Sequence, residues 1–410
     1  MYFHTDLKQL PGGVCAPAGF RASGLHCGIR PNTEKPDLAM ILADVPCAAA
    51  GVYTQNLMKG APVLVTKENL ADGKAQAVIC NSGNANTCNA DGLEKARAMC
   101  DLTAKALGLS PQDVIVASTG VIGQPLPLEP IAQGIAPLVE SLSREGGHAA
   151  ATAIMTTDTV SKELALEFTV DGIPCRIAGM AKGSGMIHPN MATMLCFLTT
   201  DCAITPALLD KALHRCVADT FNMVSVDGDT STNDTVVLMA SGLAKNPEIQ
   251  GEGAAYEAFC KALFDLLLYL STQIAGDGEG ATKLLVCSVT GAKDKEMAKA
   301  CAKSVICSPL VKAAMFGADA NCGRVLCALG YAGQPIDPHT VDVDFESEAG
   351  RIRVCAQGNG LAFDEEAAKA ILLQKEILIH VDLGLGEACA DAFGCDLTYD
   401  YVKINGDYRS

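Results

Sequence analysis

The chain has 410 residues, of which 49% are hydrophobic and 19% are charged, and its formal net charge at pH 7 is −16. This length exceeds that of one typical hydrophobic core, so we expect two domains or lobes. The composition is that of a folded globular protein rather than a disordered one. The strong negative charge disfavours nucleic acid and acidic membrane surfaces as partners. It does not restrict a small-molecule substrate, because the site for such a molecule can be locally basic.

Three features of the sequence indicate where the protein is located: its first residues, its apolar runs and its cysteines. Residues 1–6 have neither the basic start nor the apolar core of a signal peptide, and the apolar run 263–270 is too short to span a membrane. The 19 cysteines include no Cys-x-x-Cys pair, and with only 7 histidines the sequence shows no spaced zinc cluster. Many of the cysteines lie in apolar runs. We therefore expect buried, reduced side chains and a cytoplasmic location.

The first half of the chain alternates short apolar runs with turns. Asp91 and Glu94 form a capping-box pattern at the start of one helix, and Gly108 ends it. A hairpin is predicted around Asp171-Gly172 over residues 164–178. The other predicted strands cover 38–43, 63–66, 77–80 and 114–117, and the predicted helices cover 92–107 and 127–142.

The second half mixes the two element types without a strict strand–helix–strand rhythm. Thr205-Pro206 opens a helix, and Asp294 caps another. A further helix is predicted at 254–274. Further strands are predicted at 194–200, 235–240, 284–289 and 377–383. This order predicts an α+β fold, with β-sheets between layers of helices, rather than a doubly wound sheet.

The most unusual stretch runs from Gly179 to Leu195, where a glycine-rich loop precedes Thr193 and an apolar strand. Glycines at 183 and 185 allow a tight turn and a close approach of other groups. A phosphate-binding loop is not indicated, because Lys182 precedes the glycines and β-rich apolar residues follow them. Two interpretations remain at this point: an ordinary loop that enters a buried strand, or a hydroxyl held beside its own upstream carbonyl, as a self-cleaving threonine requires.

Residues 182–187 (Lys-Gly-Ser-Gly-Met-Ile) and 190–195 (Asn-Met-Ala-Thr-Met-Leu) resemble the signature of the ornithine acetyltransferase (glutamate N-acetyltransferase) family of arginine biosynthesis. The resemblance extends from Gly12 to the end of the chain. It implies an αββα-like fold and self-cleavage between Ala192 and Thr193. The products would be an α chain, residues 1–192, and a β chain, residues 193–410, which assemble as a heterotetramer of two α and two β chains.

The same resemblance implies the chemistry. Thr193 would be the nucleophile that takes acetyl from N2-acetyl-L-ornithine and passes it to L-glutamate. Its hydroxyl attacks, and its freed α-amine, with a reference pKa of about 7.7–8.0, acts as the base. Thr119 and Gly120, at the end of a predicted strand, correspond to the family's oxyanion-hole pair. No metal or cofactor is expected, and the resemblance leaves open whether acetyl-CoA is a second acetyl donor.

The implied substrate-binding residues come from distant parts of the sequence. A cation at 182 suits the α-carboxylate of an amino acid, and a carboxylate at 279 suits its amine. The family usually ends in Thr, and Ser410 retains the hydroxyl. Asp227, Asp229 and Asp234 lack the spacing of an EF-hand, and the family needs no metal, so we expect them to have a structural or a site-supporting role. The implied contacts are Thr156 (with Thr157 as the near alternative), Lys182, Thr193, Glu279, Asn405 and Ser410.

Two other functions remain open at this stage. An N-terminal-nucleophile aminopeptidase or amidase on a related scaffold would use the same hydroxyl and amine. From a different class, an unprocessed amino-acid-binding protein would keep one intact chain. Acetyl transfer from acetylornithine to glutamate separates the first alternative from the leading hypothesis, and a denaturing gel separates the second.

Overall fold

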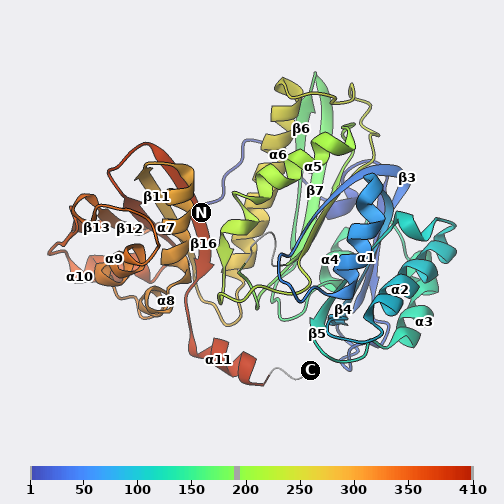
Figure 1. Ribbon diagram of the computed structural model, residues 1–410, viewed down its shortest axis with the longest axis horizontal. Helices are drawn as coiled ribbons and strands as arrows, with labels where there is room; N and C mark the ends of the chain where they lie inside the picture. Colours follow the sequence, from blue (N-terminus) through green and yellow to red (C-terminus); the bar gives the residue numbers. More distant parts are fainter. Residues whose placement is uncertain (1, 189–193, 408–410) are drawn as a thin grey trace.

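The computed structural model describes residues 2–188 and 194–407 (Figure 1). Within these residues the chain forms two β-sheets, one of nine strands and one of seven. Figure 1 shows the larger sheet and its helices on the right and the smaller sheet in a separate C-terminal lobe on the left. The expected division into two lobes is therefore observed.

The larger sheet has the order β1-β6-β7-β8-β10-β3-β4-β5, and β2 pairs with β3. The long strand β3 folds this sheet on itself, because its first part pairs with β2 and β4 while residues 48–53 pair with β10. A bulge between Leu42 and Cys47 marks the bend. The strands are β1 Lys8–Leu10, β2 Phe20–Leu25, β3 Leu38–Tyr53, β4 Lys74–Asn84, β5 Val114–Val121, β6 Lys162–Val170, β7 Ile173–Lys182, β8 Leu195–Thr200 and β10 Thr235–Ala240.

The two halves of this sheet pack face to face as leaves of a sandwich. In β3, Ile41 points between the leaves with Phe197 and Met239 of the other half, while Met40 points outward. Successive side chains of a strand point to opposite faces of the sheet. An uninterrupted apolar run is therefore typical of a strand that is buried on both faces. The run 38–43 is such a strand.

Helices cover both outer faces of the sandwich. On the leaf that contains β4 and β5, an apolar cluster joins the sheet to α1 Ala61–Asn69, α2 Gly92–Leu107 and α3 Leu128–Glu140. On the other leaf, α5 Pro206–Val217 and α6 Ala254–Gly276 pack against β3, β6 and β7. The short α4 Gly147–Ala153 packs beside β2 and β3. The order helices, sheet, sheet, helices confirms the α+β class and the αββα layering.

The C-terminal lobe is a sheet with helices against it. Its strand order is β14-β13-β12-β15-β11-β16-β9. Helix α7 packs against β11 and β16, and α10 packs against β12. The strands are β9 Val224–Ser225, β11 Leu284–Ala292, β12 Asp342–Ser347, β13 Gly350–Ala356, β14 Asn359–Gly360, β15 Glu376–Asp382 and β16 Ala388–Cys395; the helices are α7 Lys295–Cys307, α8 Pro309–Phe316, α9 Cys322–Gly330 and α10 Glu365–Leu372.

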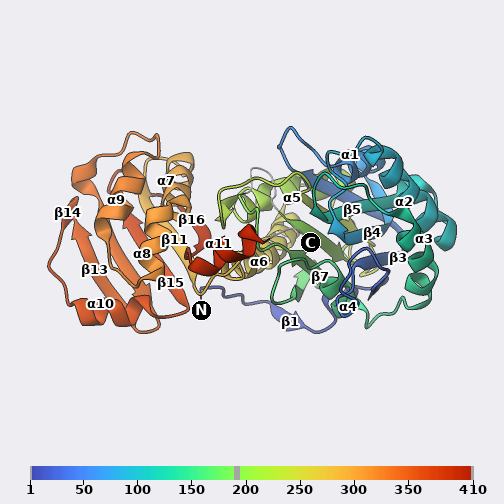
Figure 2. The same cartoon turned by 90° about the horizontal axis from the view of Figure 1, so that it is seen from below.

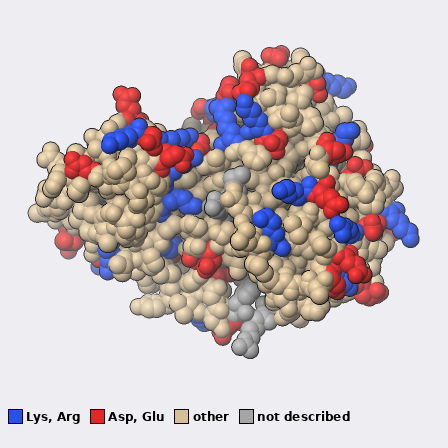
Figure 3. Space-filling view, viewed as in Figure 1, with Lys and Arg blue, Asp and Glu red and all other residues tan. Residues whose placement is uncertain are grey.

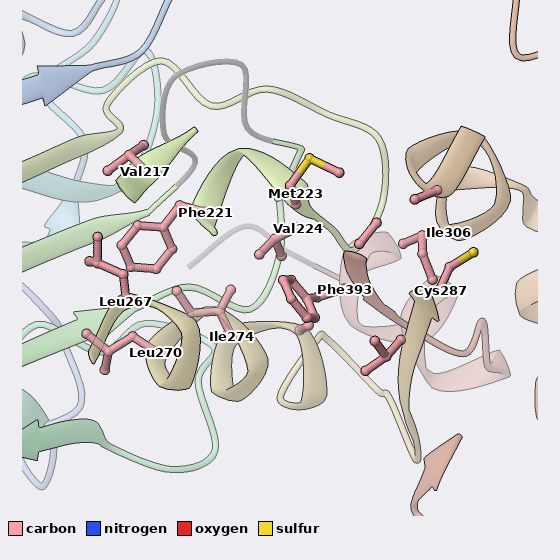
Figure 4. Close-up of a cluster of buried hydrophobic side chains, with 14 of the residues drawn as sticks. Val217, Phe221, Met223, Val224, Leu267, Leu270, Ile274, Cys287, Ile306 and Phe393 are labelled. Atoms are coloured by element: carbon pink, nitrogen blue, oxygen red, sulfur yellow. The ribbon is translucent and has the colours of Figure 1, made fainter. Parts of the chain in front are cut away.

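Helix α6 joins the two lobes. Its side chains Leu270 and Ile274 lie in the same buried apolar cluster as Phe221, Val224 and Phe393. Figure 4 shows Ile274 on the side of the helix toward Phe393, and Leu270 farther from the C-terminal lobe. By length and composition α6 could cross a membrane, but 67% of its most apolar window is buried inside the protein. We interpret it as a core helix.

The last helix, α11 Tyr399–Gly406, leaves the C-terminal lobe. Figure 2, seen from below, shows it in front of the junction between the lobes. This helix therefore lies near loops that come from both lobes.

One predicted strand is wrong. Residues 63–66 form the interior of α1, not a strand. A run of four residues, three of them apolar, is too short to distinguish the helical from the strand period, and Pro62 at the start of the helix was the better signal. Each of the 19 cysteines lies in the described part of the chain and is unpaired, and most are buried as expected.

Candidate active site

The described candidate residues meet in one cavity of about 360 Å³ between the lobes. Met194 and Leu195, which follow Thr193 in the sequence, also line this cavity. Ala192, Thr193 and Ser410 lie outside the described residues. The candidates that line it are Thr119 and Gly120 at the end of β5, Thr156 after α4, Lys182 at the end of β7, Glu279 after α6 and Asn405 in α11.

The backbone of two parallel strands places Thr119 and Gly120. Strands β4 and β5 end together, with Gly83 opposite Gly120 in the register. Gly120 has φ +130°, and a Cβ atom there would lie 2.4 Å from the carbonyl carbon of Gly83. Only glycine fits such a position without strain. The predicted Thr-Gly pair therefore lies where β4 and β5 end. The close approach of these two strands requires glycine at position 120, whatever role the pair has in catalysis.

Lys182 is a buried cation beside a buried carboxylate. Its side chain is 8% exposed, and its Nζ lies 3.8 Å from Oδ2 of Asp158. Burial lowers the pKa of Lys182, and the charge of Asp158 opposes this shift. Burial would raise the pKa of Asp158, but Lys182 and Lys162 outweigh burial and hold this pKa below its usual range. Lys182 and Asp158 thus form an ion pair at the cavity wall.

Asp158 also organises the backbone around this wall. Its carboxylate accepts hydrogen bonds from the N–H of Gly183 at 2.7 Å and from the N–H of Thr156 at 2.9 Å. It therefore links two of the predicted substrate contacts, Thr156 and Lys182, to the glycine-rich loop. Sequence reasoning missed this role. Asp158 lies two residues after Thr156, but nothing local indicates that its partners Lys182 and Gly183 are 24 or more residues away.

Glu279 and Asn405 form a hydrogen-bonded pair that joins α11 to the site. Asn405 Nδ2 donates to Glu279 Oε2 at 2.7 Å, and Glu279 is 7% exposed. The backbone N–H of Glu279 donates to the carbonyl of Ser184 at 3.0 Å, which fastens it to the glycine-rich loop. The C-terminal helix therefore orients a carboxylate in the cavity.

Two of the three aspartates singled out in the sequence, Asp227 and Asp234, lie next to the candidate site. Asp227 accepts hydrogen bonds from the N–H groups of Met186 at 2.6 Å and Ile187 at 2.8 Å, and so holds the loop that leads toward Thr193. Asp234 lines the cavity and is 2% exposed. Its Oδ2 has no hydrogen-bond partner in the part of the chain that the structure describes. Burial raises its pKa well above the ordinary value.

Asp234 also lies beside the start of β8, because it directly precedes β10, which pairs with β8. The N–H of Thr235, the next residue, donates to the carbonyl of Met194 at 2.9 Å. No group of three or more His, Cys, Asp or Glu side chains within 2–188 and 194–407 could hold a metal ion. The cavity thus combines the Thr119–Gly120 sheet edge, the amine of Lys182 and the carboxyl groups of Asp234 and Glu279.

Comparisons with a family model and with known proteins point to the same family. The ArgJ family model matches residues 21–410. The chain is 52% identical over 406 residues to the arginine biosynthesis bifunctional protein ArgJ of Symbiobacterium thermophilum, a match that covers 98% of this chain and 100% of that protein. It is 51% identical over 392 residues to ArgJ 1 of Clostridium acetobutylicum, covering 95% of this chain and 96% of that protein.

Solved structures are also similar. The crystal structure of ArgJ from Bacillus halodurans has 46% sequence identity and a TM-score of 0.50, and the match covers 52% of this chain and 98% of that one. The ornithine acetyltransferase of Mycobacterium tuberculosis, complexed with ornithine, has 42% identity and a TM-score of 0.43, covering 45% of this chain and 99% of that one.

Proposed function

Because the chain belongs to the ArgJ family, we propose that it transfers acetyl from N2-acetyl-L-ornithine to L-glutamate through an acetyl ester on Thr193. The observation that carries the proposal is the cavity itself. It gathers Thr119, Gly120, Lys182 and Glu279 from separate segments beside the first residues of β8. These are the groups that acyl transfer to an amino-acid amine requires.

The proposed maturation step creates the catalytic base. The hydroxyl of Thr193 attacks the carbonyl of Ala192, the peptide bond breaks to an ester, and water hydrolyses that ester. The products are a carboxyl group on Ala192 and a free α-amine on Thr193. With a reference pKa of about 7.7–8.0, a larger fraction of this amine is unprotonated near neutral pH than of a lysine amine, so it is available to act as a base.

The proposed transfer then proceeds through one acetyl ester. Thr193 attacks the acetyl carbonyl of acetylornithine, the C–N bond breaks, and the hydroxyl proton passes by way of the α-amine to the departing ornithine amine. The amine of glutamate next attacks the ester carbonyl and regenerates the hydroxyl. In both steps Thr119 and the N–H of Gly120 would donate hydrogen bonds to the oxyanion, where such donors act mainly on the transition state.

Amino-acid recognition follows from the charges on the cavity wall. Lys182 would meet the α-carboxylate that donor and acceptor share, because a buried cation favours an anionic partner. Glu279, oriented by Asn405, would meet a substrate amine. Thr156 stands on the same wall. The two substrates would use the site in turn, as a single acyl-enzyme requires.

The proposed cut does not have to separate the products. Strand β8, from the β chain, pairs with β7 of the α chain and with β10 of its own chain. The long β3 pairs in turn with β10. An α chain of residues 1–192 and a β chain of residues 193–410 would therefore remain one folded unit. We further propose the assembly of two such units, a cytoplasmic location, and catalysis without a metal or cofactor.

Mass spectrometry and one assay test this function. The purified chain should yield two fragments divided before Thr193, and Thr193→Ala should yield one folded, full-length, inactive chain. The fragments should transfer acetyl from acetylornithine to glutamate and leave small peptide amides intact. Normal fragments from Thr193→Ala, or amide hydrolysis without acetyl transfer, would refute the proposal.

A further inference from the structure

The proposed function brings two substrates of opposite side-chain charge to one cavity. Acetylornithine and glutamate share an α-carboxylate, and both react at the α-nitrogen. Their side chains end in an ammonium and in a carboxylate, which lie the same number of bonds from Cα. A cavity that takes both substrates in turn must therefore accept either charge at this side-chain end.

The charged residues that line the cavity, within the part of the chain that the structure describes, are Lys182, Asp234 and Glu279. Lys182 would meet the α-carboxylate that both substrates have. Glu279 can serve both substrates only at the α-nitrogen, because glutamate has no other amine. Of these three residues, Asp234 is therefore the one that remains for the side-chain end.

The carboxyl group of Asp234 is buried and has an oxygen to offer. The residue is 2% exposed, and its Oδ2 has no hydrogen-bond partner among the described residues. Its backbone is fixed, because its carbonyl accepts a hydrogen bond at 3.0 Å from the N–H of Thr54, which follows β3. A buried polar atom without a partner costs free energy. A ligand group that reaches Oδ2 in the cavity would recover that cost.

A carboxyl group can present either polarity to a ligand. When ionised it only accepts hydrogen bonds, and when protonated it also donates one. Burial raises the pKa of Asp234, while the hydroxyl of Ser231, the charge of Lys182 and the hydroxyl of Thr54 oppose this shift. A bound ammonium favours the ionised form and a bound carboxylate favours the protonated form. The protonation state of Asp234 can therefore follow the charge of the ligand.

The rest of the protein does not supply this adaptation. Figure 3 shows acidic and basic side chains interspersed over one face of the molecule. The net charge of −16 favours a cationic group over an anionic one. The side-chain carboxylate of glutamate therefore needs a hydrogen-bond donor inside the cavity.

We propose that Asp234 is the specificity residue for the side-chain end of both substrates. As a carboxylate it accepts a hydrogen bond from the ammonium of acetylornithine, and as a carboxylic acid it donates one to the side-chain carboxylate of glutamate. The proton leaves Asp234 for solvent when the first substrate binds and returns from solvent before the second, so no further reagent is needed. This inference rests on the proposed function, because the two charges alternate only if one cavity takes both substrates.

Asp234→Asn tests this assignment, because Asn keeps the shape and a hydrogen-bond donor but cannot become negative. Asp171→Asn, the same change at an exposed residue of the turn between β6 and β7, is the matched control. A single acyl-enzyme separates the half-reactions, so kcat/KM is measured for each donor and each acceptor by itself. The donors are acetylornithine and N2-acetylnorvaline, which lacks the side-chain amine. The acceptors are glutamate and glutamine, which has a neutral amide at the side-chain end.

We expect Asp234→Asn to lower kcat/KM for acetylornithine about 10–100-fold, which is the effect of one lost hydrogen bond to a charged group. The values for acetylnorvaline, glutamate and glutamine should stay within about threefold, because none of them places an ammonium at this end. Asp171→Asn should change none of the four values.

A pH series on the unchanged chain gives a second measurement that does not depend on the variant. As pH rises, more of Asp234 is ionised. The kcat/KM for glutamate should therefore fall relative to glutamine, and that for acetylornithine should rise relative to acetylnorvaline. Ratios that stay constant with pH would overturn the assignment even if Asp234→Asn failed to fold or to cleave itself.

Other outcomes separate this inference from the proposed function. An equal loss with both donors in Asp234→Asn would assign Asp234 to the architecture or to the chemical step and would overturn the specificity role. Unchanged kinetics with acetylornithine, or an equal effect of Asp171→Asn, would also overturn it. An unchanged chain that fails to transfer acetyl from acetylornithine to glutamate would refute the proposed function itself.

Discussion

Replacing Gly120 by Ala tests the link between the sheet edge and the proposed oxyanion hole. At φ +130° an Ala backbone is strained by about 1–3 kcal/mol. The new Cβ would also lie 2.4 Å from the carbonyl carbon of Gly83 and 2.6 Å from the nitrogen of Asn84. Those are backbone atoms, so relief requires β4 and β5 to separate, at a cost of about 1–3 kcal/mol. We expect Gly120→Ala to lose about 2–6 kcal/mol of unfolding free energy.

Gly123→Ala is the matched control, because Gly123 has φ +77° and a Cβ added there would have no atom within 4 Å. Gly123→Ala should lose only about 1–2 kcal/mol of unfolding free energy, which is the cost of backbone strain alone. Denaturant unfolding of both variants in the uncleaved Thr193→Ala chain compares them in one covalent state. In the cleavable chain, Gly120→Ala should lower turnover about 100–1,000-fold, because its N–H moves. Equal unfolding midpoints for the two variants, with normal turnover, would refute this reasoning.

Three further predictions concern single side chains. Thr119→Ala should lower kcat about 100–1,000-fold with less effect on KM and should slow self-cleavage in parallel; unchanged turnover per mature enzyme would exclude its hydroxyl as a donor. Asn405→Ala removes the 2.7 Å bond to Glu279 and should raise the KM for acetylornithine about fivefold to tenfold, with a smaller change in kcat; an unaltered KM would show that α11 does not orient this carboxylate. Asp234→Asn, in the Thr193→Ala chain, should be more stable at neutral pH, because burial raises the pKa of the native carboxyl. A raised folded-state pKa means that the stability of the native chain is lost as pH rises above the unfolded value. The gain from Asn should therefore shrink as pH falls toward about 3.9 and be smallest below it in a pH series of unfolding curves, and a constant gain would contradict this reasoning.

Local patterns in the sequence were sufficient for much of the fold. The strand at 114–117 and the helix at 92–107 have clear apolar patterns and end signals, and β5 and α2 match them. The segment 63–66 lacked a readable period and was assigned wrongly. Periodicity reports which face of an element is buried, and this information is local.

The sequence also determined most of the candidate site, through motifs rather than geometry. Thr119, Lys182 and Asn405 were singled out from segments that resemble one family, and the structure brings all three to one cavity. The assigned roles remain predictions until the variants are measured. Thr193, on which the chemistry depends, lies outside the described residues.

Only the tertiary structure decided which charges meet. Asp158 contacts Lys182 and holds Gly183, and the burial of Asp234 leaves one oxygen without a partner among the described residues. The fold of β3 on itself is likewise invisible in any short window of the sequence. The reason is physical. Pairings between distant strands and the desolvation of a charge depend on what the rest of the chain places around a residue, and no local pattern encodes that environment.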